Sequence, residues 1–330
     1  PEIANSFDAN LTSIYQIITV YLGATATVQL ILGRVADVYG LKRVYIIGLL
    51  AYGVAVFLIG IATTLESVVI IRILQALGNA VFLALSPALV TASVPEQYRG
   101  QALGWMTAIG MVGMILGSFG AGFVIDHYGW RWIFFARVPL TIFALGLSFW
   151  FLPTIRRSSK ASLDPLSGLL IITSIYFLML SLHRIQATIW FTFSTAIFFV
   201  SSLIALYFLL RRQMTTSAPF IPRGLLQRKS VSTGLICNFL MYLAIFVNWF
   251  VLPFFVAEII GMGPTNIGVF LTIPAILLLI ASPLGGTISD RTHPALVSTV
   301  GIFIIAVCLL SFQNVDHQST SIEIAVRMVG

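Results

Sequence analysis

Long runs of hydrophobic residues separated by short polar connectors dominate this sequence. Each run holds about 20 residues, the length that an α-helix needs to cross the hydrocarbon core of a bilayer. The runs lack the alternation over about ten residues that is typical of membrane-spanning strands. We therefore predict ten spanning helices and the start of an eleventh near residue 321, at about 11–32, 44–62, 66–93, 101–125, 131–152, 166–182, 188–210, 232–257, 265–288 and 295–312.

The composition agrees with a chain that lies mostly in lipid. The 330 residues are 58% hydrophobic and only 9% charged, and their mean hydropathy is +1.01. A soluble domain is about 25% charged. The two cysteines, Cys237 and Cys308, lie inside apolar runs and provide no disulfide framework. We therefore expect an all-α polytopic membrane protein.

The basic residues alternate between connectors, and this predicts the orientation. Connectors of one set hold thirteen of them, and those of the other set hold only Arg131 and Arg184. Positive charge marks the cytoplasmic side of a membrane. We therefore expect the connectors with thirteen basic residues in the cytoplasm and residue 1 on the outer side of the cell membrane. The bases form no basic face, which argues against nucleic acid as a partner of this +7 chain. The thirteen are Arg34, Lys42, Arg43, Arg99, Arg156, Arg157, Lys160, Arg211, Arg212, Arg223, Arg228, Lys229 and Arg291.

One short motif occurs twice. Gly33-x-x-x-Asp37 follows the first predicted helix, and Gly286-x-x-x-Asp290 follows the ninth, 253 residues later. An arginine inside an apolar run comes next in both cases: Arg72, 35 residues after Asp37, and Arg327, 37 residues after Asp290. The repeated order predicts two homologous halves, a common plan in transporters.

Several segments together resemble a known family. "GRVADVYGLKRV", "RILQALG" and "PEQYRGQALGW" resemble conserved segments of the major facilitator superfamily. "GWRWIFFARVP", "FVLPFFVAEIIGMGP" and "PLGGTISDR" resemble its fourteen-helix drug:proton antiporters. The resemblance implies two six-helix bundles separated by two extra helices. It predicts an N-terminal bundle at 1–152 whose first helix precedes this sequence, a linker with two extra helices at 153–230, and a truncated C-terminal bundle at 231–330.

Two positions depart from the family pattern. Ser118 stands where the antiporter motif of the family's fifth helix carries proline, and Arg137 stands where a small polar residue is usual. The motif helix still has a face of small residues, which permits close helix packing. We expect that packing face to contain Gly110, Gly113, Gly117, Ala121 and Gly122.

The repeated motifs are candidates for a conformational latch between the halves. An acid beside the N-terminus of a facing helix contributes about 0.3–1 kcal/mol, and up to about 2 when partly buried. Glycine lets two backbones approach closely. Turn chemistry and membrane orientation alone are the alternative. The latch would comprise Gly33, Asp37, Gly40, Arg43, Arg99, Gly286, Asp290 and Arg291.

Arg72 and Arg137 are the candidates for coupling or substrate binding. Both are expected about six residues inside the outer end of a helix, roughly 9 Å below the membrane boundary. They either extend to the outer headgroups or need an anionic partner in a wet cavity. That partner would be the substrate or an acid, which the resemblance would place on the family's first helix. Gln75, Asn79, Asn238, Tyr242 and Asn248 are further candidates for the pathway.

The sequence thus predicts a secondary transporter that works by alternating access. The resemblance implies proton-coupled efflux of drugs or amphipathic metabolites. A proton-coupled solute importer, an exporter of an anionic substrate and a non-transporting membrane sensor on the same fold are the alternatives. A membrane enzyme would need clustered acids or histidines at membrane depth, and we expect no catalytic residue, cofactor or metal. The expected partners are a small-molecule substrate, protons and the lipid bilayer.

Overall fold

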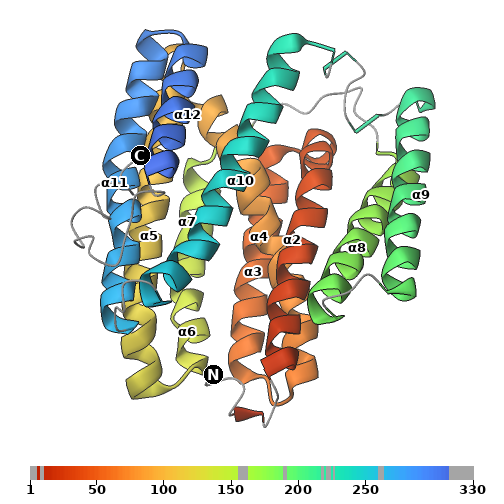
Figure 1. Ribbon diagram of the computed structural model, residues 1–330, viewed down its shortest axis with the longest axis vertical. Helices are drawn as coiled ribbons and strands as arrows, with labels where there is room; N and C mark the ends of the chain where they lie inside the picture. Colours follow the sequence, from red (N-terminus) through yellow and green to blue (C-terminus); the bar gives the residue numbers. More distant parts are fainter. Residues whose placement is uncertain are drawn as a thin grey trace. The chain divides into compact units, whose positions relative to one another are not determined.

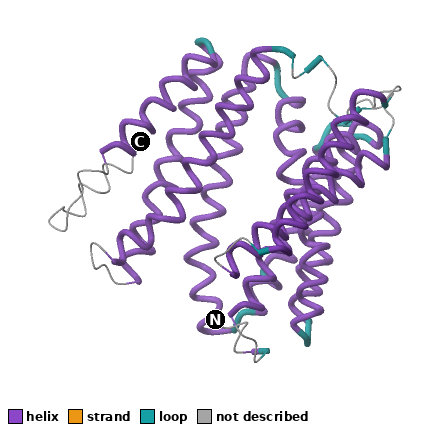
Figure 2. The backbone as a smooth tube through the Cα atoms, turned by 45° about the vertical axis from the view of Figure 1, so that its right-hand side comes forward, coloured by secondary structure: helices purple, strands orange, loops and turns teal. Residues whose placement is uncertain are grey.

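The structure is a computed structural model in which residues 6–7, 11–154, 163–188, 192–216, 219–220, 224–225, 227–258 and 264–311 are described. These residues form helices and loops with no strand among them (Figures 1 and 2). The helices are α2 (Leu11–Tyr39), α3 (Leu41–Ile61), α4 (Leu65–Ser93), the 3-10 turn η1 (Glu96–Tyr98), α5 (Arg99–Tyr128), α6 (Arg131–Phe135), α7 (Arg137–Phe151), α8 (Pro165–Thr188), α9 (Phe193–Thr215), α10 (Lys229–Glu258), α11 (Pro264–Arg291) and α12 (Pro294–Ser311).

The helical, membrane-spanning character predicted from the sequence is confirmed. Within the described residues, nine helical segments are long and apolar enough to cross a bilayer, and Pro294–Cys308 is a shorter apolar helix. Large hydrophobic side chains are exposed along these spans, for example Trp150 at 86% and Phe193 at 84%. In water such exposure would be costly, whereas in lipid it is the expected outer surface.

Several helix ends differ from the predicted ones. The helix α2 continues to Tyr39, so Gly33 and Asp37 lie on its last turns and not in a loop, and the chain turns only at Gly40, whose φ is 93°. Gly286 and Asp290 likewise lie on the last turns of α11. Charged residues at a helix end can remain helical outside the hydrocarbon. Hydropathy therefore does not predict the residue at which a helix ends.

The predicted helix 131–152 is divided into α6 and α7. Pro139 lacks a backbone N–H, and its ring clashes with the carbonyl four residues earlier, at Phe135. The division falls at Ala136, directly after that residue. Arg184 and Arg212, expected in connectors, lie inside α8 and α9, because both helices are longer than their apolar cores.

The chain divides into two compact units. The first comprises residues 1–89 and 121–225, and the second comprises 90–120 and 226–330. The helix α5 contributes its first part to the second unit and its last turns to the first. The proposed division into bundles at 1–152, 153–230 and 231–330 stays a prediction.

The first unit has a small apolar core at each end of its helices. At one end, buried Val56, Ile59, Val68, Trp130 and Phe134 pack together. At the other end, the core contains Leu32, Ala36, Val44, Ala80, Val81 and Leu85. Gly78 allows α4 to approach α3, because a Cβ there would lie 2.7 Å from the carbonyl oxygen of Gly48.

The helices α8 and α9 pack side by side through buried hydroxyl-bearing residues. Ser167, Ser174 and Ser181 recur every seven residues on α8, and Thr195 and Ser202 share this spacing on α9; all five are buried. The Ser174 and Ser202 hydroxyls each donate to the other residue's carbonyl, at 3.3 and 2.8 Å. Small residues with a seven-residue period permit close helix packing in a membrane. The pair contacts α2 through α8, and a Cβ at Gly23 would lie 2.7 Å from Met179 Sδ.

An ion pair closes one end of this helix pair. The Arg212 Nε and Nη2 atoms of α9 donate to the two carboxylate oxygens of Asp164, both at 2.8 Å. The Ser167 hydroxyl donates to the same carboxylate at 2.7 Å. The Asp164 side chain is only 6% exposed. The hydrogen bonds from Arg212 hold the pKa of Asp164 well below its usual value, against the opposing effect of burial.

We expect Asp164→Asn to lower the temperature of unfolding by a few degrees at neutral pH. The reason is that the Arg212 guanidinium loses the buried carboxylate with which it forms an ion pair. A carboxylate with a depressed native pKa stabilises the fold above its unfolded pKa, near 3.9, and the contribution is lost as the pH falls toward the native value. The difference from the wild type should therefore be constant from pH 7 to 5. Thermal unfolding of the purified protein at several pH values measures it. Glu66→Gln, at an exposed carboxylate, is the control. An equal effect of both variants would contradict the prediction.

Candidate functional site

A cluster of arginine and aromatic side chains lies inside the first unit. Arg72 is on α4, two turns after its start at Leu65, and Arg137 begins α7. Both guanidinium groups lie over the ring of Phe134, with their central carbons 5.1 and 5.8 Å from its centroid. The Arg72 guanidinium also faces the ring of Tyr21 on α2, at 5.5 Å. The aromatic faces carry partial negative charge and so compensate part of the cost of bringing two cations together.

Among the described residues, Arg72 donates its hydrogen bond to a neutral group. Its Nη1 atom donates to Gln75 Oε1 at 2.8 Å. Gln75 lies one turn further along α4, on the same face, and is completely buried. Arg72 therefore points into the helical unit, and the described structure does not show it extending to lipid.

Two donors of this cluster have no acceptor among the described residues: Arg72 Nε and Gln75 Nε2. Buried donors are nearly always satisfied in native proteins, and each orphaned one is costly. Nor does an acidic side chain form an ion pair with Arg72 or Arg137 within the described part of the chain. The cluster has the positive charge and the spare donors that an anionic group would satisfy.

Arg137 is more exposed than Arg72 and less strongly held. Its Nη1 atom lies 3.5 Å from the hydroxyl of Tyr52, at the limit of a hydrogen bond. By contrast, Arg131 has a structural position: its Nη2 donates to the carbonyl of Ala62 at 3.0 Å, and its guanidinium stacks on Trp130 at 4.5 Å. Arg131 and Arg137 thus differ, and of these two Arg137 faces the cluster.

The other predicted pathway residues are not brought to this cluster by an observed contact. Asn79 is half-buried on α4, one turn beyond Gln75. Asn238 and Tyr242 are exposed on α10 in the second unit, where Tyr242 stacks on Phe246. The side chain of Asn248 lies outside the described residues, as does all of Arg327. Their roles stay predictions.

A second candidate site lies within the second unit, at the start of α5. The two carboxylate oxygens of Asp290 accept hydrogen bonds from the backbone N–H groups of Gly100 and Gln101, both at 2.7 Å. These N–H groups belong to the first turn of α5, where they have no partner within the helix. The carboxylate thus caps a helix 190 residues away in the sequence, at its positive dipole end.

Three glycines let the two helices approach this closely. A Cβ at Gly100 would lie 2.6 Å from the carbonyl oxygen of Gly286, and one at Gly286 would collide with the backbone of Gly100. A Cβ at Gly104 would collide with the carbonyl oxygen of Ser282. The Ser282 hydroxyl donates to the carbonyl of Gly104 at 3.1 Å. Gly286 and Asp290 are one turn apart on α11, so the motif supplies both the space and the charge for one contact.

The first copy of the motif has a different environment. The side chain of Asp37 is 58% exposed, and one oxygen lies 3.9 Å from Arg34 Nη1. Gly33 has no atom within 4 Å of an added Cβ. Arg43 and Arg291 are exposed, and Arg99 donates to Glu96 Oε1 at 3.0 Å and to the Thr91 carbonyl at 3.3 Å. A latch role for these residues stays a prediction.

Three glycines of the predicted packing face of α5 have open space beside them among the described residues, and the packing role of this face stays a prediction. No atom lies within 4 Å of a Cβ built at Gly110, Gly113 or Gly117. Ala121 is half-buried, and the burial of Ser118 and Gly122 lies outside the description. Gly100 and Gly104 make close backbone contacts along α5, and they were not among the residues predicted from the sequence. Their four-residue spacing on one helix face was the available signal.

Comparisons with known proteins give a family and a fold. The model of the Major Facilitator Superfamily matches residues 1–226 and 234–330. The riboflavin transporter RibZ of Clostridioides difficile is 25% identical over 88% of this chain and 63% of its own length. The multidrug export protein EmrB of Escherichia coli is 25% identical over 93% of this chain and 60% of its length. The chain thus spans about three fifths of these relatives.

A third relative and a solved structure agree with these. The tetracenomycin C resistance and export protein of Streptomyces glaucescens is 24% identical over 97% of this chain and 60% of its own length. The solved structure is that of the proton:xylose symporter XylE, bound to 6-bromo-6-deoxy-D-glucose. It covers 96% of this chain and 67% of its own, with a TM-score of 0.59 and 14% identity, and therefore supports the fold alone.

Proposed function

The chain belongs to the Major Facilitator Superfamily, and on this basis we propose that the complete protein is a secondary active transporter that moves small molecules across the cell membrane by alternating access. The named functions of RibZ, EmrB and the tetracenomycin exporter support transport. Two of these three names describe export. We propose proton-coupled efflux of drugs or amphipathic metabolites, with the basic loops in the cytoplasm.

The observation that carries the proposal is the Arg72 cluster. A desolvated arginine is costly inside a membrane and is retained where it has a functional partner. Among the described residues, Arg72 Nε and the Nε2 atom of buried Gln75 both lack an acceptor. A group that carries negative charge in one state of the cycle would pair with Arg72 and leave it in another. An acid of the complete protein that takes up a proton has this property.

A second candidate is export or import of an anionic substrate. Arg137 stands where the family usually has a small polar residue, and it brings a second guanidinium to the ring of Phe134. Two cations over one ring fit a carboxylate or phosphate of the substrate, which would accept from both guanidinium groups. In this case the substrate itself supplies the charge that the described residues lack.

The capped start of α5 supports alternating access. Breaking the Asp290 contact removes two charge-assisted hydrogen bonds and a dipole interaction, a modest cost compared with that of unfolding the helices. Such a contact can hold one conformation and still open during a cycle. The pseudo-repeat predicts that Asp37 makes the matching contact, with both acids on one membrane face.

Reconstitution of the complete protein in vesicles tests the proposal. An imposed pH gradient should drive accumulation of a cationic or neutral amphipathic dye, and a protonophore should abolish it. Transport of an organic anion that persists without a pH gradient would favour the second candidate. Failure to move any compound in a broad panel, with correct insertion, would contradict transport and favour a sensor.

A further inference from the structure

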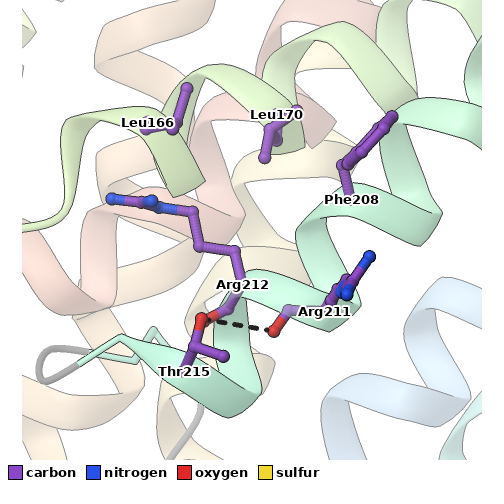
Figure 3. Close-up of a pocket in the computed structure, with 6 residues that line it drawn as sticks. All are labelled: Leu166, Leu170, Phe208, Arg211, Arg212 and Thr215. Atoms are coloured by element: carbon purple, nitrogen blue, oxygen red, sulfur yellow. Dashed lines mark hydrogen bonds between the residues drawn. The ribbon is translucent and has the colours of Figure 1, made fainter.

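A shallow pocket of about 410 Å³ lies between α8 and α9, at the end where α8 begins and α9 ends (Figure 3). Leu166 and Leu170 of α8 line one side, one helical turn apart. The residues of α9 that line it recur at the spacing of one helix face: Phe208, Arg211, Arg212 and Thr215. We infer that this pocket binds the phosphate-bearing headgroup of an anionic phospholipid, in the leaflet next to the basic loops.

The two arginines at the pocket differ in charge balance. Arg212 turns toward Leu166, and its guanidinium is neutralised by the two-point contact with Asp164. Arg211 turns toward Phe208 (Figure 3), is exposed, and forms no ion pair among the described residues. Among the described residues, the pocket therefore has one unit of uncompensated positive charge.

Apart from Asp164, which pairs with Arg212, the connector sequences at this end of α8 and α9 are basic and contain no acid. The stretches closest in sequence that lie outside the description are 155–162, 217–218 and 221–223. They contain Arg156, Arg157, Lys160 and Arg223 but no acid. These stretches thus contain no carboxylate for Arg211.

The position of the pocket points to a lipid. Its residues lie at the first turns of the span Pro165–Ile185 and the last turns of Phe193–Thr215, the level at which lipid phosphates meet hydrocarbon. Leu166 and Phe208 are 46% and 51% exposed beside Arg211. A phospholipid fits both the charged and the apolar part of the pocket. Its phosphate accepts hydrogen bonds from the guanidinium group, and its acyl chain covers the apolar side chains. Basic pockets between spanning helices bind anionic headgroups in this manner.

Lipid binding to the complete protein tests this inference. The delipidated protein in a neutral detergent is titrated with phosphatidylglycerol or phosphatidylcholine, and native mass spectrometry gives an apparent Kd for each lipid. The wild type should prefer phosphatidylglycerol. Arg211→Gln should weaken that lipid about fivefold, the contribution of one basic residue at an anionic surface, and leave phosphatidylcholine unchanged. Arg211→Lys should retain most of the preference.

Two further variants keep the test specific. Arg228→Gln removes the same charge from an exposed residue outside the pocket and should leave the preference intact. Leu170→Trp fills the pocket without changing charge and should weaken phosphatidylglycerol. Equal losses in Arg211→Gln and Arg228→Gln, or no loss in Arg211→Gln, would overturn the inference.

A separate arm identifies the source of the phosphate. Glycerol 3-phosphate and inorganic phosphate should not displace phosphatidylglycerol, because they lack the acyl chains. Displacement that depends on Arg211 would make this a site for a soluble phosphate and overturn the assignment to lipid. The readout needs no transport, so its outcome is independent of whether the proposed function holds.

Discussion

Replacing Arg72 with alanine is expected to reduce transport by about one to two orders of magnitude in the complete protein. A hydrogen bond to a charged group contributes about 1.5–3 kcal/mol, and about 1.4 kcal/mol is a factor of ten in affinity. Arg72 can donate one further hydrogen bond of this kind, since its Nε atom lacks a partner among the described residues. The loss should appear in uptake or efflux by vesicles that contain equal amounts of protein.

The loss should not come from poor insertion. An arginine within a spanning helix costs up to about 2.5–3.5 kcal/mol on insertion scales, the value for the helix centre, so alanine makes the helix easier to insert. Arg72→Lys should recover only part of the activity, because lysine keeps the charge but lacks the planar fork.

Gln75→Glu provides a second, opposite test at the same site. A carboxylate one turn from Arg72, in place of an amide that already lies 2.8 Å from it, should form an ion pair and compete with the natural anion. Transport should fall although the arginine is intact. Full activity of the alanine variant would show that Arg72 is only a structural anchor.

The second large effect is expected from Gly286→Ala on α11. The added Cβ would collide with the backbone of Gly100, and a backbone cannot move aside as a flexible side chain can. The start of α5 and the end of α11 should separate, and Asp290 should lose its contact with the amides of Gly100 and Gln101. We expect transport to fall several-fold while insertion is preserved.

Gly285→Ala is the matched control for this change. It lies one residue earlier on the same helix, and no atom lies within 4 Å of its added Cβ. Its activity should be close to that of the wild type. Accessibility of a cysteine introduced near residue 100 to a membrane-impermeant thiol reagent would measure the opening directly.

Asp290→Asn separates charge from shape in the same contact. Asparagine can accept only at one oxygen and has no charge to interact with the helix dipole, so the helix cap should weaken by about 0.3–2 kcal/mol. Asp37→Asn, in the first motif copy, is also expected to lower transport without preventing insertion. If either variant lost inserted protein in proportion to activity, the acid would have a folding role and not a latch role.

Hydropathy was sufficient to predict the fold class. Runs of about 20 apolar residues have few solutions in a membrane, since the backbone must satisfy its own hydrogen bonds and a helix does so locally. The helix ends were predicted less well. Charged residues such as Asp37 and Arg212 continue their helices beyond the hydrocarbon, and the division at Ala136 follows from Pro139, whose effect depends on local backbone geometry.

The candidate sites were accessible from the sequence only in part. Arg72 could be identified because a charge inside an apolar run is conspicuous by itself, and Gln75 follows from helical spacing. Asp290 was identified through its repeat. Its partners, the amides of Gly100 and Gln101, could not be, because any helix N-terminus offers such groups and only packing selects one.

What the sequence determined alone is therefore what short-range physics controls: the spanning helices, the family motifs, and the presence of charges where charge is costly. The tertiary structure decided which of these meet. It brought Arg72 and Arg137 over one ring, paired Arg212 with Asp164 across 48 residues, and left Arg211 beside it without an acidic partner among the described residues. Pairing of this kind depends on distances between helices, and a linear sequence does not contain those distances.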